Sequence, residues 1–349
     1  MTSALRVVAP GLAATLQDFG RTGYQRQGVP VSGALDRVAL AAANIVVGNP
    51  AGAAGVEMLY QGAAFDVLAD SARISVAGAG AKLAIEDGDG ASSSIAACES
   101  VTVRRGARIK ITIPGPGIAA YLAVAGGFDV PPVMGSRSTY ARAGIGGIAG
   151  RILEAGQLLT LALPAAPPGT ERRLSIASFA PPSVARVVAG PQHDHFSRAA
   201  WEAFLAATWR VLPMSDRMGL RLDGPTIAAE KGHDIVSDGI APGAIQVPGD
   251  GRPIVLLADR QTTGGYAKIA TVISADVPAL GRLAPGMAFR FAAVDIADAE
   301  AARRKLDAEI ARWPSLLVDV AGGTPDTARL LAANLIDGVV DAHEPSAHV

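Results

Sequence analysis

Polar side chains that can bind anions or move protons gather in five stretches of the chain, each set among glycines or other small residues. The stretches are 17–21 with 28–36, 44–49 with 57, 126–128 with 135–140, 215–222, and 246–248 with 259–266. Arginine forks bind carboxylate or phosphate through two parallel hydrogen bonds. Aspartate can accept a proton or orient a nucleophile, and backbone N–H groups at glycine-rich turns can stabilise an oxyanion. The mixture is typical of a site for an anionic or carbonyl substrate.

Residue type suggests a role for each member of these stretches. Our catalytic candidates are Asp259 as the acid or base, Arg217, Thr262 and Tyr266. Our substrate-binding candidates are Gln17, Asp18, Arg21, Asn44, Arg137, Arg221, Gln246, Arg260, Thr263, Gly264 and Gly265. The stretch 262–266 ranks first because it follows an apolar strand, and a barrel exposes binding loops where its strands end.

Each stretch also has a structural interpretation, which stays open at this point. Asp18 and Arg21 can form a plain ion pair, and the consecutive glycines Gly264 and Gly265 can serve only to make a turn. Ser32 can act as a helix cap and nothing more.

Several common kinds of site are absent from the sequence. It contains no P-loop, no Gly-x-Ser-x-Gly nucleophile elbow, and no His-Glu-x-x-His or paired Cys-x-x-Cys motif. His193 and His195 flank Asp194, which fits a helix cap better than a metal pair, so we expect no metal. No lysine lies in a biotin-carrier motif, so biotin would have to be carried by another chain.

Composition narrows the class of protein. Half of the 349 residues are hydrophobic and 18% are charged, so the chain can bury a large core. A net charge of −1 argues against nucleic acid or anionic lipid as a partner. No apolar run approaches the length of a membrane helix. The single cysteine, Cys98, suits a reducing compartment, so we expect a cytoplasmic protein that binds neither nucleic acid nor membrane.

Short apolar strands separated by turns dominate the chain. The 40 glycines and 23 prolines supply those turns, a pattern typical of barrels or sandwiches. Helices are expected only at about 36–47, from Asp194, at about 298–313, and from Thr324.

The chain also shows a faint internal duplication. The letters RVVA occur at 6–9 and again at 186–189, and the stretch 163–172 is rich in proline and alanine, as linkers are. We therefore expect an N-terminal lobe at 1–165, a second lobe at 180–296 and a helical C-terminal tail at 297–349.

Seven stretches together resemble one known family. They are 15–21 (TLQDFGR), 28–36 (GVPVSGALD), 43–49 (ANIVVGN), 135–140 (GSRSTY), 215–222 (SDRMGLRL), 243–248 (GAIQVP) and 259–266 (DRQTTGGY). In order and spacing they resemble the allophanate hydrolase subunit 2 or KipA family, which includes the C subunit of 5-oxoprolinase. The resemblance extends over about residues 5 to 295.

The resemblance implies a mainly β fold, the carboxyltransferase domain, with two cyclophilin-like β-barrel lobes and few helices. It implies a protein that acts with a KipI-like B subunit and a LamB/YcsF-like A subunit. In that arrangement ATP drives the opening of a small-molecule amide or lactam, 5-oxo-L-proline, to L-glutamate. Two alternatives stay open: a carboxyltransferase component of a biotin-dependent urea-carboxylase-type enzyme, and a non-enzymatic antagonist that binds a KipI-like protein. The resemblance does not assign the catalytic residues.

Overall fold

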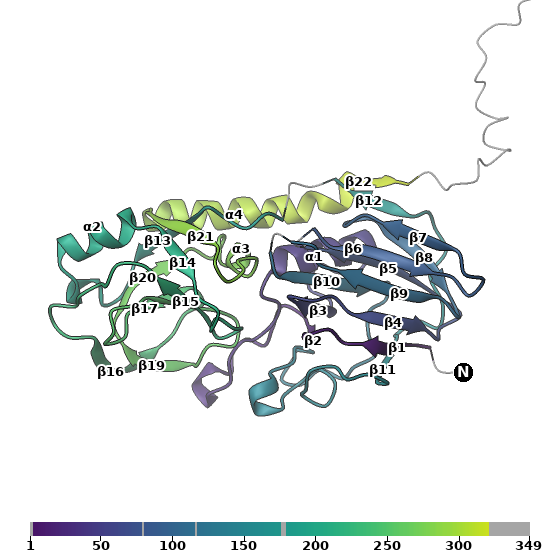
Figure 1. Cartoon of the computed structure of the whole chain (residues 1–349), viewed down its shortest axis with the longest axis horizontal. Coiled ribbons are helices and arrows are strands. Elements are labelled where there is room, and N and C mark those ends of the chain that lie inside the picture. The colour runs from purple at the N-terminus through teal and green to yellow at the C-terminus, as the bar shows by residue number, and fades with distance from the viewer. Residues whose placement is uncertain (1–2, 79, 116, 176–178, 321–349) are drawn as a thin grey trace, which may run out of the picture.

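A computed structural model describes residues 3–78, 80–115, 117–175 and 179–320. Two lobes made mainly of strands lie next to each other along the long axis of the molecule (Figure 1). The first lobe contains the strands between residues 4 and 160, and the second those between 184 and 293. This arrangement confirms the expected mainly β fold with few helices.

The first lobe consists of two antiparallel sheets. One has the order β11 (Leu158–Thr160), β1 (Ala4–Ala9), β4 (Ala64–Val67), β9 (Arg108–Thr112), β6 (Lys82–Glu86), β7 (Ser92–Ile95). The other has the order β2 (Ala13–Gln17), β3 (Gly55–Leu59), β10 (Ala119–Val124), β5 (Ser71–Ala77), β8 (Ser100–Arg104). Apolar side chains of both sheets, among them Phe65, Ile74 and Leu122, share one core.

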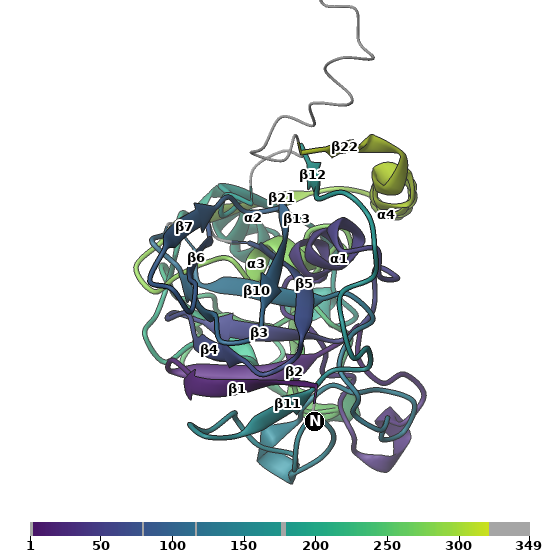
Figure 2. The same cartoon turned by 90° about the vertical axis from the view of Figure 1, so that its right-hand side faces the viewer.

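Burial along the strands follows from which faces are covered. In β9, Ile109 and Ile111 are buried while the residues between and beside them are exposed, because only one face of that sheet is covered. Strand β10 is buried at all six positions. Its second face is covered by helix α1 (Arg37–Val46), which lies against β10 and β5 (Figure 2).

Helix α1 confirms the expected helix near 36–47. The Asp36 carboxylate accepts hydrogen bonds from the N–H groups of Val38 and Ala39, both 3.1 Å long, and so caps the helix. Gly48 follows the helix with a φ of +85°, a left-handed conformation that glycine adopts without strain.

The second lobe is a closed barrel with short helices around it. Its strand order is β13 (Val184–Ala189), β20 (Lys268–Val272), β17 (Ala244–Gln246), β18 (Ile254–Leu256), β15 (Gly219–Asp223), β14 (Trp209–Val211), β21 (Ala288–Ala293). A separate two-stranded ribbon is formed by β16 (Asp234–Gly239) and β19 (Thr263–Tyr266). The short helical segments of this lobe are η3 (His193–His195), α2 (Arg198–Ala206) and α3 (Val277–Leu280), whereas η1 (Gln25–Gln27) and η2 (Ala141–Ala143) belong to the first lobe.

The expected cap at Asp194 is wrong. Ser197 caps α2 by accepting a 3.1 Å hydrogen bond from the N–H of Ala200, while Asp194 lies one turn earlier in η3. Asp194 instead binds Lys231 at 2.5 Å. Both residue types make good caps, so local sequence did not separate them.

One long helix connects the lobes. Helix α4 (Ile296–Arg312) begins at the end of the barrel and extends along the molecule toward the first lobe (Figure 1). It confirms the helix expected at about 298–313. It continues through η4 (Trp313–Leu316) into β22 (Leu317–Asp319), which pairs with β12 (Arg172–Leu174) in the predicted linker region. The helix expected from Thr324 lies outside the described residues, and the lobe boundaries stay a prediction.

The duplicated letters RVVA occupy matching positions at the start of each lobe. One copy lies in β1 and the other in β13. The lobes nevertheless close differently, because β11 runs antiparallel to β1 whereas β21 runs parallel to β13. Among the helices that the structure describes, none is long and apolar enough to cross a membrane.

Candidate functional site

Arg217 is the centre of a polar network where the two lobes meet. It precedes β15, and its guanidinium binds both carboxylate oxygens of Asp259, at 2.8 and 3.0 Å. From the first lobe it binds the Glu57 carboxylate and, at 2.8 Å, the carbonyl oxygen of Gly33. Burial lowers the pKa of Arg217, but the charges of Asp259 and Glu57 outweigh that effect and raise it above the ordinary value. Arg217 therefore stays charged and links the lobes.

Glu57 is a charged residue in an otherwise apolar strand, β3. Its side chain is fully buried, and its second oxygen accepts hydrogen bonds from the N–H of Leu35 at 2.8 Å and from the Tyr121 hydroxyl at 2.7 Å. Tyr121 lies directly opposite Glu57 on β10. Burial, with the nearby charges of Glu57 and Asp36, raises the pKa of Tyr121 well above its usual value, so its hydroxyl remains a neutral donor.

A second ion pair lies beside this network. Arg282, which follows α3 in the second lobe, binds the Asp36 carboxylate at 2.6 and 3.3 Å. The backbone N–H of Asp36 donates to the Tyr121 hydroxyl at 2.7 Å. Asp36 therefore caps α1, binds the opposite lobe and contacts the hydroxyl that serves Glu57. Buried charges need such complete pairing, so the network fixes the two lobes relative to each other.

A cavity of about 260 Å³ opens onto this network. Arg217, Asp259 and Tyr60 are among the residues that line it. At its edge, Arg142 of the first lobe binds Asp216 of the second at 3.0 Å, and both side chains are exposed. A carboxylate offers about four acceptor positions, so Asp259 can accept a substrate N–H or a proton while Arg217 holds it. The cavity is thus a candidate site for acid–base chemistry on a small molecule.

Asp18 is the centre of a second cluster. Its carboxylate accepts from the hydroxyls of Ser136, at 2.6 Å, and Ser138, and from the N–H groups of Arg137, at 2.6 Å, and Gly20, at 2.7 Å. Burial raises the pKa of Asp18, but these four hydrogen bonds outweigh that effect, and the net shift is downward. The carboxylate is therefore held in its charged form.

Arg21 lies between the two clusters. It is 1% exposed and donates to the Ser138 carbonyl, while its Nε and Nη1 have no partner among the residues described. Burial lowers its pKa, and the charges of Asp18 and Asp259 act in the opposite direction. Arg217 and Asp259 thus lie at the junction of the lobes, and Arg21 interacts electrostatically with both Asp18 and Asp259. The site roles of all four residues stay predictions.

Other selected residues lie elsewhere in the fold. The Gln17 amide binds the carbonyl of Thr139 at 3.0 Å, and the Asn44 amide binds the carbonyl of Ala53 at 2.7 Å, so both support the backbone of the first lobe. Arg137, whose backbone N–H binds Asp18, is exposed, and so is Arg221. Arg260 lines a second, larger cavity between the lobes. Gln246 lies in β17. Residue 262 precedes β19, and residues 263–266 form that strand of the exposed ribbon. Neither Gln246 nor any residue of 262–266 is among the described residues that line the two cavities. The roles of all these residues stay predictions.

Sequence reasoning placed Glu57 and Asp36 in the polar stretches but not among the candidate site residues, and it did not single out Tyr121 or Arg282 at all. A signal existed for Glu57, because a single charge within an apolar strand is costly to bury unless it is paired. The same argument applies to the one hydroxyl in β10. The sequence around Arg282 does not indicate a paired charge, since its partner Asp36 lies 246 residues away in the chain.

Comparison with known proteins agrees with this architecture. The family model described as carboxyltransferase domain, subdomain A and B, matches residues 27–293. The C subunit of 5-oxoprolinase from Escherichia coli is 35% identical over 305 residues, which cover 86% of this chain and 94% of the relative. The crystal structure of the Kluyveromyces lactis urea carboxylase superposes with a TM-score of 0.80 at 29% identity, over 92% of this chain and 30% of that one.

The crystal structure of TTHA0988 superposes with a TM-score of 0.74 at 36% identity, over 83% of this chain. The match covers 55% of TTHA0988, so this chain spans about half the length of that protein. The sequence matches, the structural matches and the motifs in 15–49 and 215–266 all indicate the same protein family. The chain therefore belongs to the carboxyltransferase-domain family, subdomains A and B, in agreement with its resemblance to the KipA proteins and to the C subunits of 5-oxoprolinases.

Proposed function

We propose that the chain is the C subunit of a 5-oxoprolinase-type enzyme that opens 5-oxo-L-proline to L-glutamate at the expense of ATP. The observation that carries the proposal is the match to the C subunit of the Escherichia coli 5-oxoprolinase, which extends over 94% of that relative at 35% identity. A similarity over nearly the whole of a named subunit supports the same position in a complex.

The proposed chemistry overcomes the low reactivity of a lactam. The γ-phosphoryl group of ATP moves to the lactam oxygen and ADP leaves, which makes the ring carbon electrophilic. A water molecule adds to that carbon, the ring C–N bond breaks, and a second water releases phosphate. The sum consumes ATP and two waters, and it yields L-glutamate, ADP and phosphate. In this scheme Asp259 takes or supplies the proton at the small cavity while Arg217 holds its orientation.

The proposal includes partner subunits, a KipI-like B subunit and a LamB/YcsF-like A subunit, in the cytoplasm. The exposed β16–β19 ribbon supports a heteromeric site. Val236 on β16 is 92% exposed and Tyr266 on β19 is 41% exposed, and the two paired strands offer a partner both an aliphatic and an aromatic side chain. Strand β19 begins at Thr263, close in the chain to Arg260, so a partner bound there lies near the junction of the lobes.

A carboxyltransferase role is the second candidate function. The observation that favours it is the similarity to the Kluyveromyces lactis urea carboxylase, which covers 92% of this chain at a TM-score of 0.80. In that role the chain receives a carboxyl group from biotin on another chain, because its own sequence has no biotin-carrier lysine motif.

The test is reconstitution with purified A-like and B-like subunits. We expect 5-oxo-L-proline to stimulate phosphate release with stoichiometric L-glutamate, and we expect no turnover from this chain alone. A parallel assay with a biotinylated carrier, urea and labelled bicarbonate examines the second candidate. Labelled product only in that assay would favour carboxyl transfer, whereas partner binding without turnover in either assay would favour the antagonist.

A further inference from the structure

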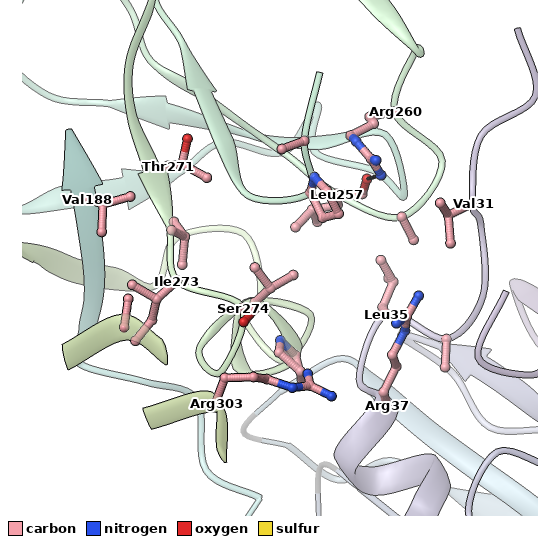
Figure 3. A pocket seen from close by; sticks show the side chains of 18 of the residues that line it. Val31, Leu35, Arg37, Val188, Leu257, Arg260, Thr271, Ile273, Ser274 and Arg303 are labelled. Carbon is pink, nitrogen blue, oxygen red and sulfur yellow. Dashed lines mark hydrogen bonds between the residues drawn. The ribbon is translucent and has the colours of Figure 1, made fainter. Parts of the chain in front are cut away.

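A cavity of about 570 Å³ lies between the lobes on the side covered by α4 (Figure 3). Leu35 and Arg37 line it from the first lobe, Leu257 and Ile273 from the second, and Arg303 from α4. The volume lies within the range of about 300–1,000 Å³ that is usual for small-molecule pockets. Leu35 and Leu257 also line the smaller cavity, so the two spaces share a wall.

Arg260 supplies a buried positive charge to this cavity. Its side chain is 1% exposed and is directed toward the space in Figure 3. Its Nε donates to the carbonyl of Ile240 at 3.0 Å and its Nη1 to that of Leu257 at 3.3 Å. Within the described part of the chain, Nη2 has no partner and no carboxylate forms an ion pair with Arg260. Buried arginines are normally paired, so the unpaired Nη2 of Arg260 can bind an anion that enters the cavity.

Further positive charges surround Arg260. Arg37 and Arg303 line the same cavity, and Arg37 lies over the ring of Phe19 with its Cζ 5.9 Å from the ring centre. Burial, and then the charge of Arg37, lowers the pKa of Arg260 to about 10. Burial, and then the charge of Arg303, lowers the pKa of Arg37. Like charges therefore accumulate here, and each destabilises the others.

Acidic residues on the cavity wall do not compensate these charges. Of the described residues that line the cavity, Glu300 is the one acid, and it binds Arg304 on its own helix at 3.3 Å. Arg303 is paired with Asp307 one turn further along. Arg37 and Arg260 are thus the two lining arginines for which the described residues provide no ion pair.

We propose that this cavity binds a small organic anion, with its carboxylate or phosphate on Arg260 and Arg37 and its apolar part against Leu35, Leu257 and Ile273. Guanidinium forks suit both of these oxyanions. The mixture of an apolar wall and a few converging polar groups is what small-molecule sites commonly show. The proposal goes beyond the proposed function, because it assigns a binding site on this chain that needs no partner protein. Leu35 and Leu257 form the wall that separates this site from the smaller cavity, which Asp259 lines.

The site spans three parts of the fold, which gives the ligand a second effect. The anion contacts the start of α1, the barrel, and the wall contributed by α4. A ligand that binds the folded form stabilises it in proportion to the logarithm of its concentration above Kd. An anion here therefore raises the melting temperature of the chain and strengthens the contact between the lobes.

The first experiment uses the purified full chain with three probes of similar shape. Benzoate carries a carboxylate, phenyl phosphate carries a phosphate, and benzamide carries no charge. We expect at least one anion to raise Tm and to give a calorimetric binding signal, with benzamide at least about tenfold weaker because it cannot satisfy the arginines. The stronger anion identifies which of the two oxyanions the site prefers. Equal binding of benzamide, or no binding by either anion, overturns the proposal.

Matched variants then locate the site. Arg260→Met and Arg37→Met should each weaken the preferred anion by at least about tenfold. Arg198→Met is the control, because Arg198 is 91% exposed on α2, outside the cavity, and it should leave binding unchanged. Without added anion, Arg260→Met should melt at or above the wild-type temperature, since it removes an unpaired buried charge.

The same variants can also contradict the proposed anion site. Full binding by Arg260→Met places the anion elsewhere and overturns the proposal. If Arg260→Met does not fold, Arg37→Met decides, because Arg37 is only partly buried. These measurements use the isolated chain, so they succeed or fail independently of the assay with the A-like and B-like subunits.

Discussion

Arg217 of the second lobe and Glu57 of the first lobe form an ion pair across the junction between them. Glu57 is fully buried and Arg217 is 14% exposed, so both charges are largely removed from water. A buried charge that loses its partner is left without compensation, which costs more than the pair itself contributes. The stability of the two-lobed arrangement therefore depends on this pair.

Removal of Glu57 should strongly destabilise the chain. We expect Glu57→Ala to lower the free energy of unfolding by about 3–5 kcal/mol, measured by urea denaturation. The exposed Glu202, which pairs with Arg198 on α2, serves as the control, and Glu202→Ala should cost at most about 0.5 kcal/mol. In a double-mutant cycle with Arg217→Met, the double variant should be more stable than the sum of the two losses predicts. Strict additivity would contradict the coupling.

The role of Asp259 can be separated from its structural contribution. In the assembled enzyme, Asp259→Asn should lower kcat/KM by about 10²–10⁴-fold, because it keeps the size of the side chain but cannot exchange the proton. Arg217→Lys keeps the charge but loses the two-pronged contact with Asp259, so it should also lower the rate. Wild-type kinetics in both folded variants would show that the pair only holds the lobes together.

The Asp18 cluster predicts a pH-dependent contribution to stability. Its pKa is lower in the folded chain than the ordinary value of 3.8, because four hydrogen bonds outweigh the effect of burial. A carboxylate with a lowered folded pKa stabilises the fold above its unfolded pKa, and that stability disappears as pH falls through the folded pKa. Asp18→Asn should therefore cost about 1.5–3 kcal/mol near pH 7, and the difference from wild type should shrink below about pH 4.

Urea denaturation of wild type and Asp18→Asn across this pH range measures the effect. Asp70→Asn is the control, because Asp70 lies in an exposed ion pair with Arg105 and should matter little at any pH. A difference between Asp18→Asn and wild type that stays constant with pH would argue against the assigned charge state.

Cys98 should be chemically inert in the folded chain. It is 4% exposed, and burial raises the pKa of its thiol to about 12. The reactive species is the thiolate, so a disulfide reagent at about pH 8 should label the native chain far more slowly than the denatured chain. Cys98→Ser should also leave the assembled enzyme active. Rapid labelling of the native chain would show that this site opens readily.

The exposed ribbon should contribute to partner binding. Val236→Asp adds a charge to a side chain that is 92% exposed, so it should leave the melting temperature nearly unchanged while it weakens binding of the B-like subunit. Leu12 is also exposed, at 67%, but lies in the first lobe, and Leu12→Asp is the matched control. Calorimetry with the purified B-like subunit distinguishes the two. An equal effect, or none, would exclude the ribbon from the interface.

Local patterns in the chain were reliable where the structure depends on neighbours in sequence. The helix expected at about 36–47 corresponds to α1, and the helix expected at about 298–313 corresponds to α4. The candidate site residues stay a prediction. Arg217 and Asp259, found as polar residues among glycines, pair at the junction of the lobes, while Asn44, selected on the same ground, binds the carbonyl of Ala53.

The sequence by itself determined the fold class, the family and the identity of the polar residues available for a site. Only the tertiary structure decided that Glu57 and Arg217, 160 residues apart, form one pair, and that the described residues provide no acid to pair with the buried Arg260. The physical reason is that strand patterning and caps depend on contacts within a few residues, which the local sequence records. Compensation of a buried charge depends on which distant segments pack together, and no single stretch of the chain contains that information.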